Sequence, residues 1–181
     1  MKVVNSQTIH FEAQLSKIGS LTVLRLPKET SAQLPSRGLV MVKGAINSAD
    51  FQTPLEPDGK GSHWMKVNKA LLERAKACVG DTVKMVVESI KDWPEPKVPA
   101  DVQKVLDSDP SAHELWKDIT PLARWDWLRW INGTKQAETR QKRIVVMCSK
   151  LNAGKRNACC FNRSECTDPE VSNRGVLIGA V

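Results

Sequence analysis

The sequence contains no run of about 18 consecutive apolar residues, so no membrane-spanning helix is expected. Its beginning, MKVVNSQTIHFEAQL, has neither a long apolar core nor a small-residue cleavage site, so no secretory signal is predicted. Together the two absences predict a cytoplasmic protein. The hydrophobic content of 41% is typical of a globular chain.

Metal-ligating residues are scarce. The sequence has three histidines, and no HExxH or similar spacing connects them. Its five cysteines are an odd number in a chain without a predicted secretory signal, so a disulfide framework is not expected. Cys159, Cys160 and Cys166 form CCx5C, whereas zinc sites usually contain two spaced pairs. Reactive or incidental thiols are therefore favoured over a metal site, and no cofactor is predicted.

Recognisable catalytic motifs are also missing. There is no GxSxG sequence, no pair of spaced carboxylates at an obvious pocket and no spacing that selects a Ser-His-Asp triad. The glycine-rich stretch DGKGSH, residues 58–63, lacks the GxxxxGK[ST] spacing of a phosphate-binding loop, and a strand-like segment follows it. A hairpin turn with Asp58-Gly59 is predicted instead. A binding protein is thus favoured over an enzyme.

The first 93 residues read mainly as strands. TIHFEAQLSKI, SLTVLRLP, SHWMKVN and DTVKMVVESIKDW alternate apolar and polar residues, and RGLVMVKGAIN and ADFQTPLEP are further candidates. One helix is predicted in KALLERAKACVG, with Asn68 as its N-cap and Gly80 closing it. Six short strands with one inserted helix predict a small β-barrel over residues 1–93.

The proline-rich segment 94–100 is predicted to be a hinge, because prolines disfavour helix and lack backbone donors. The period beyond it changes to that of helices, so residues 101–153 are predicted to form a helical module. Ser111 and Thr120 are expected N-caps, and Gly133-Thr134 is expected to interrupt the helical pattern. Residues 154–181 follow no clear pattern and are predicted to be a partly disordered tail. The predicted class is α+β.

Positive charge gathers toward the C-terminus. The net charge is +7, and residues 140–181 contain 8 basic against 3 acidic side chains, a net of +5. Arg140 and Arg143 stand three residues apart on the last predicted helix, where they could bind an anion together. Glu138 and Lys142 are spaced to pair on the same helix.

Several segments resemble a known combination of domains. FEAQLSKIGSLTVLRLP, GLVMVKGAINSADFQTPLEPDGKGSHWMKVNKAL and VGDTVKMVVESI resemble a bacterial family of unknown function. The resemblance implies a small double-split β-barrel of the broad kind also seen in AbrB-like folds. LARWDWLRWINGTKQAETRQKRI resembles the YdeI/OmpD-associated, or bacteriocin-protection, helical module. The positions that carry this second resemblance are Trp130, Ile131, Lys135, Glu138, Thr139, Arg140 and Arg143. It implies a bacterial protein linked to stress or bacteriocin tolerance, and it supplies no reaction.

Three functional hypotheses follow. The first is a non-catalytic binding protein that holds an anionic ligand between its two domains; the predicted partner is a small anionic ligand or a protein. Its predicted ligand-binding residues are Lys60, His63, Lys135, Glu138, Arg140 and Arg143. The second is nucleic-acid binding, suggested by the barrel type and the basic C-terminal segment. The third is an enzyme that uses Glu138 or His63 as a general acid or base.

Overall fold

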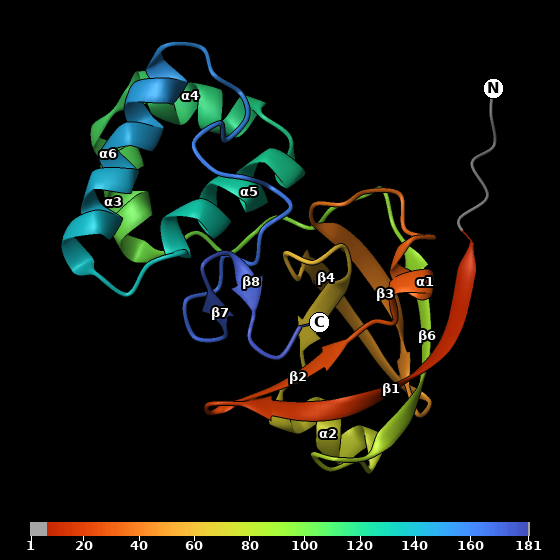
Figure 1. Cartoon of the computed structure of the whole chain (residues 1–181). Helices are drawn as coiled ribbons and strands as arrows, with labels where there is room; N and C mark the ends of the chain where they lie inside the picture. Colours follow the sequence, from red (N-terminus) through yellow and green to blue (C-terminus); the bar gives the residue numbers. More distant parts are fainter. Residues whose placement is uncertain (1–6, 181) are drawn as a thin grey trace, which may run out of the picture. The chain divides into compact units, whose positions relative to one another are not determined.

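A computed structural model describes residues 7–180 of the chain. Contacts between residues divide it into two compact units. Of the described residues, 7–92, 163–166 and 170–180 form the barrel unit, and 93–162 and 167–169 form the helical unit. The predicted α+β class is confirmed, with a barrel first and helices after it (Figure 1).

The barrel unit is built on a closed barrel of six antiparallel strands in the order β1-β2-β5-β4-β3-β6. Their bounds are β1 Thr8–Ile18, β2 Leu21–Arg25, β3 Val40–Ile46, β4 Ala49–Pro57, β5 His63–Lys66 and β6 Thr82–Ser89. Strand β6 closes the barrel by pairing with both β1 and β3. All six predicted strands are therefore confirmed.

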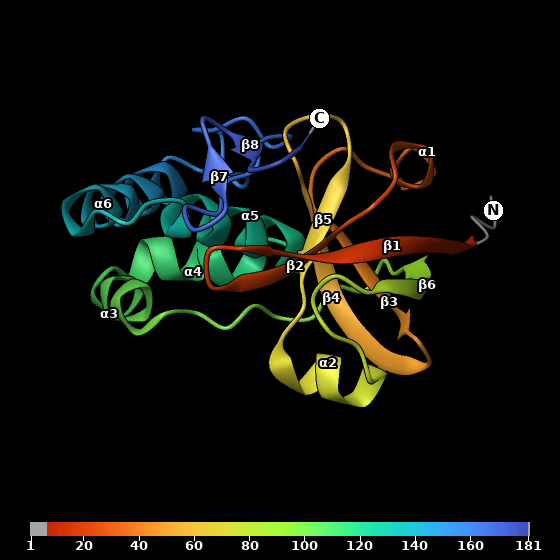
Figure 2. The same cartoon turned by 60° about the horizontal axis from the view of Figure 1, so that its bottom comes forward.

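Alternating side chains of the strands fill the barrel interior. Leu15, Leu24, Val42, Leu55 and Val87 are buried and belong to one apolar cluster. Figures 1 and 2 show helix α2 (Lys69–Ala75) at one end of the barrel, and its Leu71 and Ala75 join this cluster. The short helix α1 (Lys28–Ser31) precedes β3.

The capping of α2 was predicted only in part. Asn68 is confirmed as the N-cap, since its side chain accepts a hydrogen bond of 2.8 Å from the Leu71 N–H. The helix does not extend to Gly80. It ends at Ala75, where Lys76 adopts the left-handed conformation at φ 50°. Lysine therefore fills the position that was expected for glycine, and Gly80, at φ 97°, lies in the following turn.

Residues 163–166 and 170–180 pack on the barrel through a small apolar cluster. Strands β7 (Ser172–Asn173) and β8 (Val176–Leu177) form a two-stranded hairpin. The side chains of Cys166, Val171 and Leu177 are buried in a cluster with Val23 and Trp64 of the barrel strands. Part of the segment that was predicted to be a partly disordered tail thus forms a hairpin anchored by apolar contacts.

The helical unit consists of α3 (Ala100–Ser108), α4 (Pro110–Asp118), α5 (Pro121–Asn132) and α6 (Ala137–Asn152). One apolar cluster holds them together, with the fully buried Trp127 and Ile131 of α5 packed with Ile144 and Met147 of α6. The predicted interruption at Gly133-Thr134 is confirmed by the gap between α5 and α6.

Two helix starts in this unit were predicted with different success. Thr120 caps α5 by accepting from the Ala123 N–H, with Pro121 at the first helical position, as predicted. The prediction for α4 was wrong, because its N-cap is Asp109, which accepts from the Ala112 N–H. Pro110 suits the first turn, where its missing N–H leaves no bond unmade, so the helix begins before Ser111.

Candidate functional site

The stretch DGKGSH joins β4 to β5 through residues 58–62. Asp58 organises this turn. Its buried carboxylate accepts from the backbone N–H groups of Lys60 at 2.7 Å and Ser62 at 2.8 Å and pairs with Arg25 Nε at 2.7 Å. The predicted hairpin is confirmed, although five residues form the connection and a side chain holds it together.

The ionisation of Asp58 depends on these partners. Burial alone would raise the pKa of its carboxyl, but the two backbone N–H donors and the Arg25 guanidinium outweigh burial, so the pKa lies below its ordinary value. The turn therefore contains a buried, charged anchor, and its N–H groups point inward to a carboxylate of the same chain. A phosphate group would have to replace that carboxylate.

Glycine is required at position 59 for two reasons. Gly59 has φ 77°, a conformation that L side chains rarely adopt. A Cβ at this position would stand 2.1 Å from the Gly175 carbonyl oxygen. The turn thus touches the β7–β8 hairpin backbone to backbone, and the Leu177 N–H donates to the Asp58 carbonyl oxygen at 2.9 Å.

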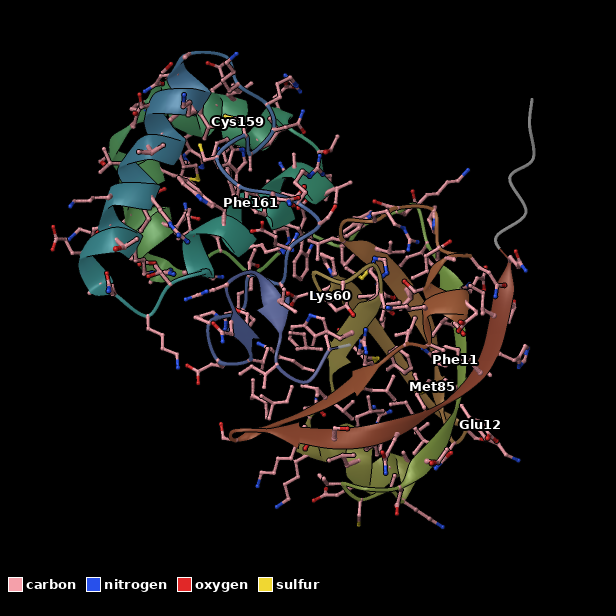
Figure 3. All side chains as sticks on the ribbon, in the orientation of Figure 1. Phe11, Glu12, Lys60, Met85, Cys159 and Phe161 are labelled. Atoms are coloured by element: carbon pink, nitrogen blue, oxygen red, sulfur yellow. The ribbon has the colours of Figure 1, made fainter. Side chains whose placement is uncertain are left out.

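The two predicted ligand-binding residues of the barrel unit differ in exposure. Lys60 is exposed on the β4–β5 turn (Figure 3). His63 is fully buried, and its Nε2 lies 2.8 Å from the Gly38 carbonyl oxygen while Nδ1 lies 2.7 Å from Ser31 Oγ. Because a carbonyl can only accept, Nε2 carries a proton, and a neutral ring accepts the Ser31 hydroxyl proton at Nδ1. His63 thus ties α1 and the segment before β3 to β5.

The other four predicted residues lie at the start of α6 or just before it, in the helical unit. Arg140 donates to Asp101 of α3 from Nε at 2.6 Å and Nη2 at 3.0 Å, and to the Asn132 side chain from Nη1 at 2.6 Å. It therefore joins α3, the end of α5 and α6. The Arg140 guanidinium also keeps the pKa of the Asp101 carboxyl below its ordinary value.

Glu138 and Lys142 pair across one turn of α6, with 2.7 Å between Oε1 and Nζ. Both side chains are largely exposed, so the pair contributes only a few tenths of a kcal/mol in water. The predicted i,i+4 pair is confirmed. Lys135 is exposed in the connection between α5 and α6.

Arg143 differs from the other motif cations. It is half-buried, and its side chain reaches back to the end of α5, where Nη1 donates to the Trp130 carbonyl oxygen. The guanidinium carbon lies 5.4 Å from the centre of the Trp130 ring. Within residues 7–180 it forms no ion pair. Burial lowers the pKa of this guanidinium, since no carboxylate offsets its partial loss of hydration.

Arg143, Arg140 and Lys135 gather around the α5–α6 connection. A Cβ built on Gly133 would stand 3.2 Å from Arg143 Nη1, Arg140 reaches Asn132, and Lys135 lies two residues beyond Gly133. The N-cap residue of α6, Gln136, makes no side-chain cap hydrogen bond, so the N–H groups of the first turn add a partial positive charge beside the acidic Glu138. These features define the cationic corner: Lys135, Arg140, Arg143 and the first turn of α6.

The structure can be compared with the sequence predictions for metal sites, membrane helices and the role of Asp58. Among the described residues, no cluster of three His, Cys, Asp or Glu side chains is arranged to hold a metal ion. No helix in residues 7–180 is long and apolar enough to cross a bilayer. The organising role of Asp58 was missed. Its signal was an acidic residue beginning a glycine-rich turn, where a side chain commonly accepts from N–H groups two and more residues ahead.

Comparison with known families agrees with this division. Residues 11–87 match the family described as Domain of unknown function (DUF1905). Residues 95–154 match the family described as Bacteriocin-protection, YdeI or OmpD-Associated. No curated protein matches the chain. The resemblance drawn from the sequence is confirmed: a match to DUF1905 is followed along the chain by a match to the bacteriocin-protection, YdeI or OmpD-associated family.

Proposed function

We propose that the protein is a non-catalytic binding protein and that it holds a small anion, such as a phosphate, sulfate or carboxylate group, at the cationic corner. Arg143 carries the proposal. A partly buried guanidinium is normally paired with a carboxylate, and among the described residues this one has only a carbonyl oxygen and an indole face as partners. An anion at the corner would supply the missing negative charge.

The neighbouring groups support a ligand of this charge. Asp101 already neutralises Arg140, so the charge that the corner offers to a ligand is that of Arg143. The first turn of α6, where Gln136 makes no side-chain cap, also favours a nearby anion. A hydrogen bond from a charged donor contributes about 1.5–3 kcal/mol. Two such bonds, about 3–6 kcal/mol together, predict dissociation constants from several millimolar to tens of micromolar for a small inorganic anion.

Another role for Arg143 is purely structural, because a cation near the last carbonyls of a helix stabilises that helix end. The two roles predict different behaviour toward ligands. A structural Arg143 makes the protein less stable when replaced and leaves anion binding unchanged. An anion-binding Arg143 controls how much the protein is stabilised by the ligand.

A thermal-shift screen separates the two roles. The full chain is tested at low ionic strength with phosphate, sulfate, nucleotides, sugar phosphates and short nucleic acids. A ligand that binds only the folded state raises the melting temperature by mass action. Anion-induced shifts in the native protein that disappear in Arg143→Gln and persist in Lys142→Gln support the proposal. Lys142 is the matched control, since it has the same charge on the same helix but is exposed.

Two results would overturn it. Equal shifts in native protein and Arg143→Gln would leave Arg143 with its structural role alone. Stabilisation by nucleic acid in preference to all small anions, with steep loss on adding salt, would favour the nucleic-acid alternative.

We infer further that this binding serves tolerance to bacteriocins, following the description of the family matched by residues 95–154. Bacteria that express the native chain or Lys142→Gln should survive bacteriocin challenge better than bacteria that express Arg143→Gln at equal protein levels. Equal survival with Arg143→Gln would separate the anion site from that physiological role.

A further inference from the structure

Two adjacent cysteines are exposed on the loop that follows α6. The sulfur atoms of Cys159 and Cys160 lie 3.8 Å apart, and both side chains are accessible to solvent. Cys148 and Cys166 are buried, and Cys78 is exposed but has no second cysteine beside it in sequence. Figure 3 shows Cys159 and Phe161 on this loop of the helical unit.

The loop that carries the thiols is held on both sides. Ala158, directly before the pair, is 5% exposed and belongs to the apolar cluster of the helical unit. Phe161, directly after the pair, packs against the same cluster, with the Arg129 guanidinium carbon 5.4 Å from its ring centre. Arg156 adds a third attachment through Nη1, which lies 2.7 Å from Asp118 Oδ2. The backbone on either side is therefore fixed while both thiols face solvent.

The pKa of the Cys160 thiol depends on its neighbours. Partial burial and the neighbouring Cys159 raise the pKa of the Cys160 thiol, while the positive charge of Lys150 acts in the opposite direction. At 3.8 Å one S–H can donate to the other sulfur, so the two thiols act on each other directly.

We propose that Cys159 and Cys160 form a chelating site for trivalent arsenic compounds and related thiophilic metalloids. Two sulfurs so close together can occupy two positions on one arsenic atom. With an organic arsenoxide, two S–H bonds and the As=O bond break, two As–S bonds form, and the two protons leave with the oxygen as one water. The arsenic remains trivalent, so no oxidant or reductant is needed.

The advantage over a single thiol is the intramolecular second step. After one sulfur has bound arsenic, the second is already beside it at a high effective concentration. Joining two binding events in this way typically strengthens binding by 10² to 10⁴ fold. A monothiol competitor should therefore displace the ligand from Cys78 and leave it on the pair.

Phenylarsine oxide tests the site. The reduced full-length chain is treated with the reagent, exposed to excess glutathione and examined by intact-mass spectrometry and peptide mapping. The expected result is one adduct that has lost one water, bridges Cys159 and Cys160, and survives glutathione. A small dithiol such as 2,3-dimercaptopropanol should remove it.

Single substitutions provide the comparison. Cys159→Ser and Cys160→Ser should each lose at least 100-fold in resistance to glutathione, whereas Cys78→Ser should behave as the native chain does. The serine variants change exposed side chains, so circular dichroism should show the same fold in all of them. Absence of a glutathione-resistant adduct in the native chain, or equal resistance in Cys160→Ser, would overturn the proposal.

Discussion

Replacing Gly59 by alanine should detach the β7–β8 hairpin from the barrel. The added Cβ would stand 2.1 Å from the Gly175 carbonyl oxygen and 3.0 Å from the Val176 Cα. These are backbone atoms, so the hairpin itself must move away. The alanine would also keep a left-handed conformation, which costs about 1–2 kcal/mol.

The movement weakens two further interactions. The hydrogen bond from the Leu177 N–H to the Asp58 carbonyl oxygen contributes about 1 kcal/mol. Partial exposure of Leu177 and Val171, both buried against Val23 and Trp64, removes about 1–2 kcal/mol more. We therefore expect Gly59→Ala to lower the free energy of unfolding of the barrel unit by about 3–5 kcal/mol.

A neighbouring glycine provides the control. Gly61 lies in the same turn at φ 87°, and an added Cβ there would meet no heavy atom within 4 Å. Gly61→Ala should show only the backbone strain of about 1–2 kcal/mol. Urea unfolding followed by circular dichroism measures both variants, and hydrogen exchange at residues 171–178 reports detachment of the hairpin. Equal destabilisation, with unchanged exchange in Gly59→Ala, would refute the close contact between turn and hairpin.

Three other substitutions test the fold and its charges. Asp58 has a depressed pKa in the folded state, so its stabilisation is present above the ordinary carboxyl pKa of 3.8 and is lost as the pH falls through the folded value. Asp58→Asn should therefore flatten the acid side of a curve of unfolding free energy against pH, and an unchanged curve would contradict this. Arg140→Lys cannot keep both hydrogen bonds to the Asp101 carboxylate, so it should lower the free energy of unfolding in urea by about 1–2 kcal/mol, against about 0.5 kcal/mol or less for Lys142→Ala. Equal losses would show that the Arg140 bonds add little. Gly44→Ala would place a Cβ 1.9 Å from the Val86 carbonyl oxygen between β3 and β6, so we expect a barrel unit destabilised by several kcal/mol in the same assay, and native stability would mean that the strands can separate at that point.

Local sequence signals located most of the secondary structure, because they act over a few residues. Alternation identified four of the six strands, and Asn68 and Thr120 identified two helix starts through side chains that reach the next turn. The same reasoning misplaced the start of α4, since both Asp109 and Ser111 can cap and the rigid proline between them decides. The choice between two neighbouring N-cap candidates depends on backbone geometry, which the sequence pattern does not specify.

Contacts between distant segments could not be derived from the sequence. His63 follows a glycine turn and was predicted to bind the ligand, yet it is fully buried and its ring nitrogens contact Ser31 and Gly38. Cys166 looked like part of a tail without structure, yet it is buried with Val23. Arg140 and Arg143 were chosen as an anion-binding pair, and only the positions of Asp101 and Trp130 show that one is paired with a carboxylate and the other is not.

The most direct test of the proposed function is calorimetric titration of the full chain with inorganic phosphate at low ionic strength, where screening of the corner is weakest. We predict saturable binding by the native chain, binding weakened at least 10-fold in Arg143→Gln, and a change of less than twofold in Lys142→Gln. A 10-fold loss corresponds to about 1.4 kcal/mol, the lower limit expected for one charged hydrogen bond. Absence of binding by the folded native chain, or equal affinity in Arg143→Gln, would contradict an anion site at the cationic corner.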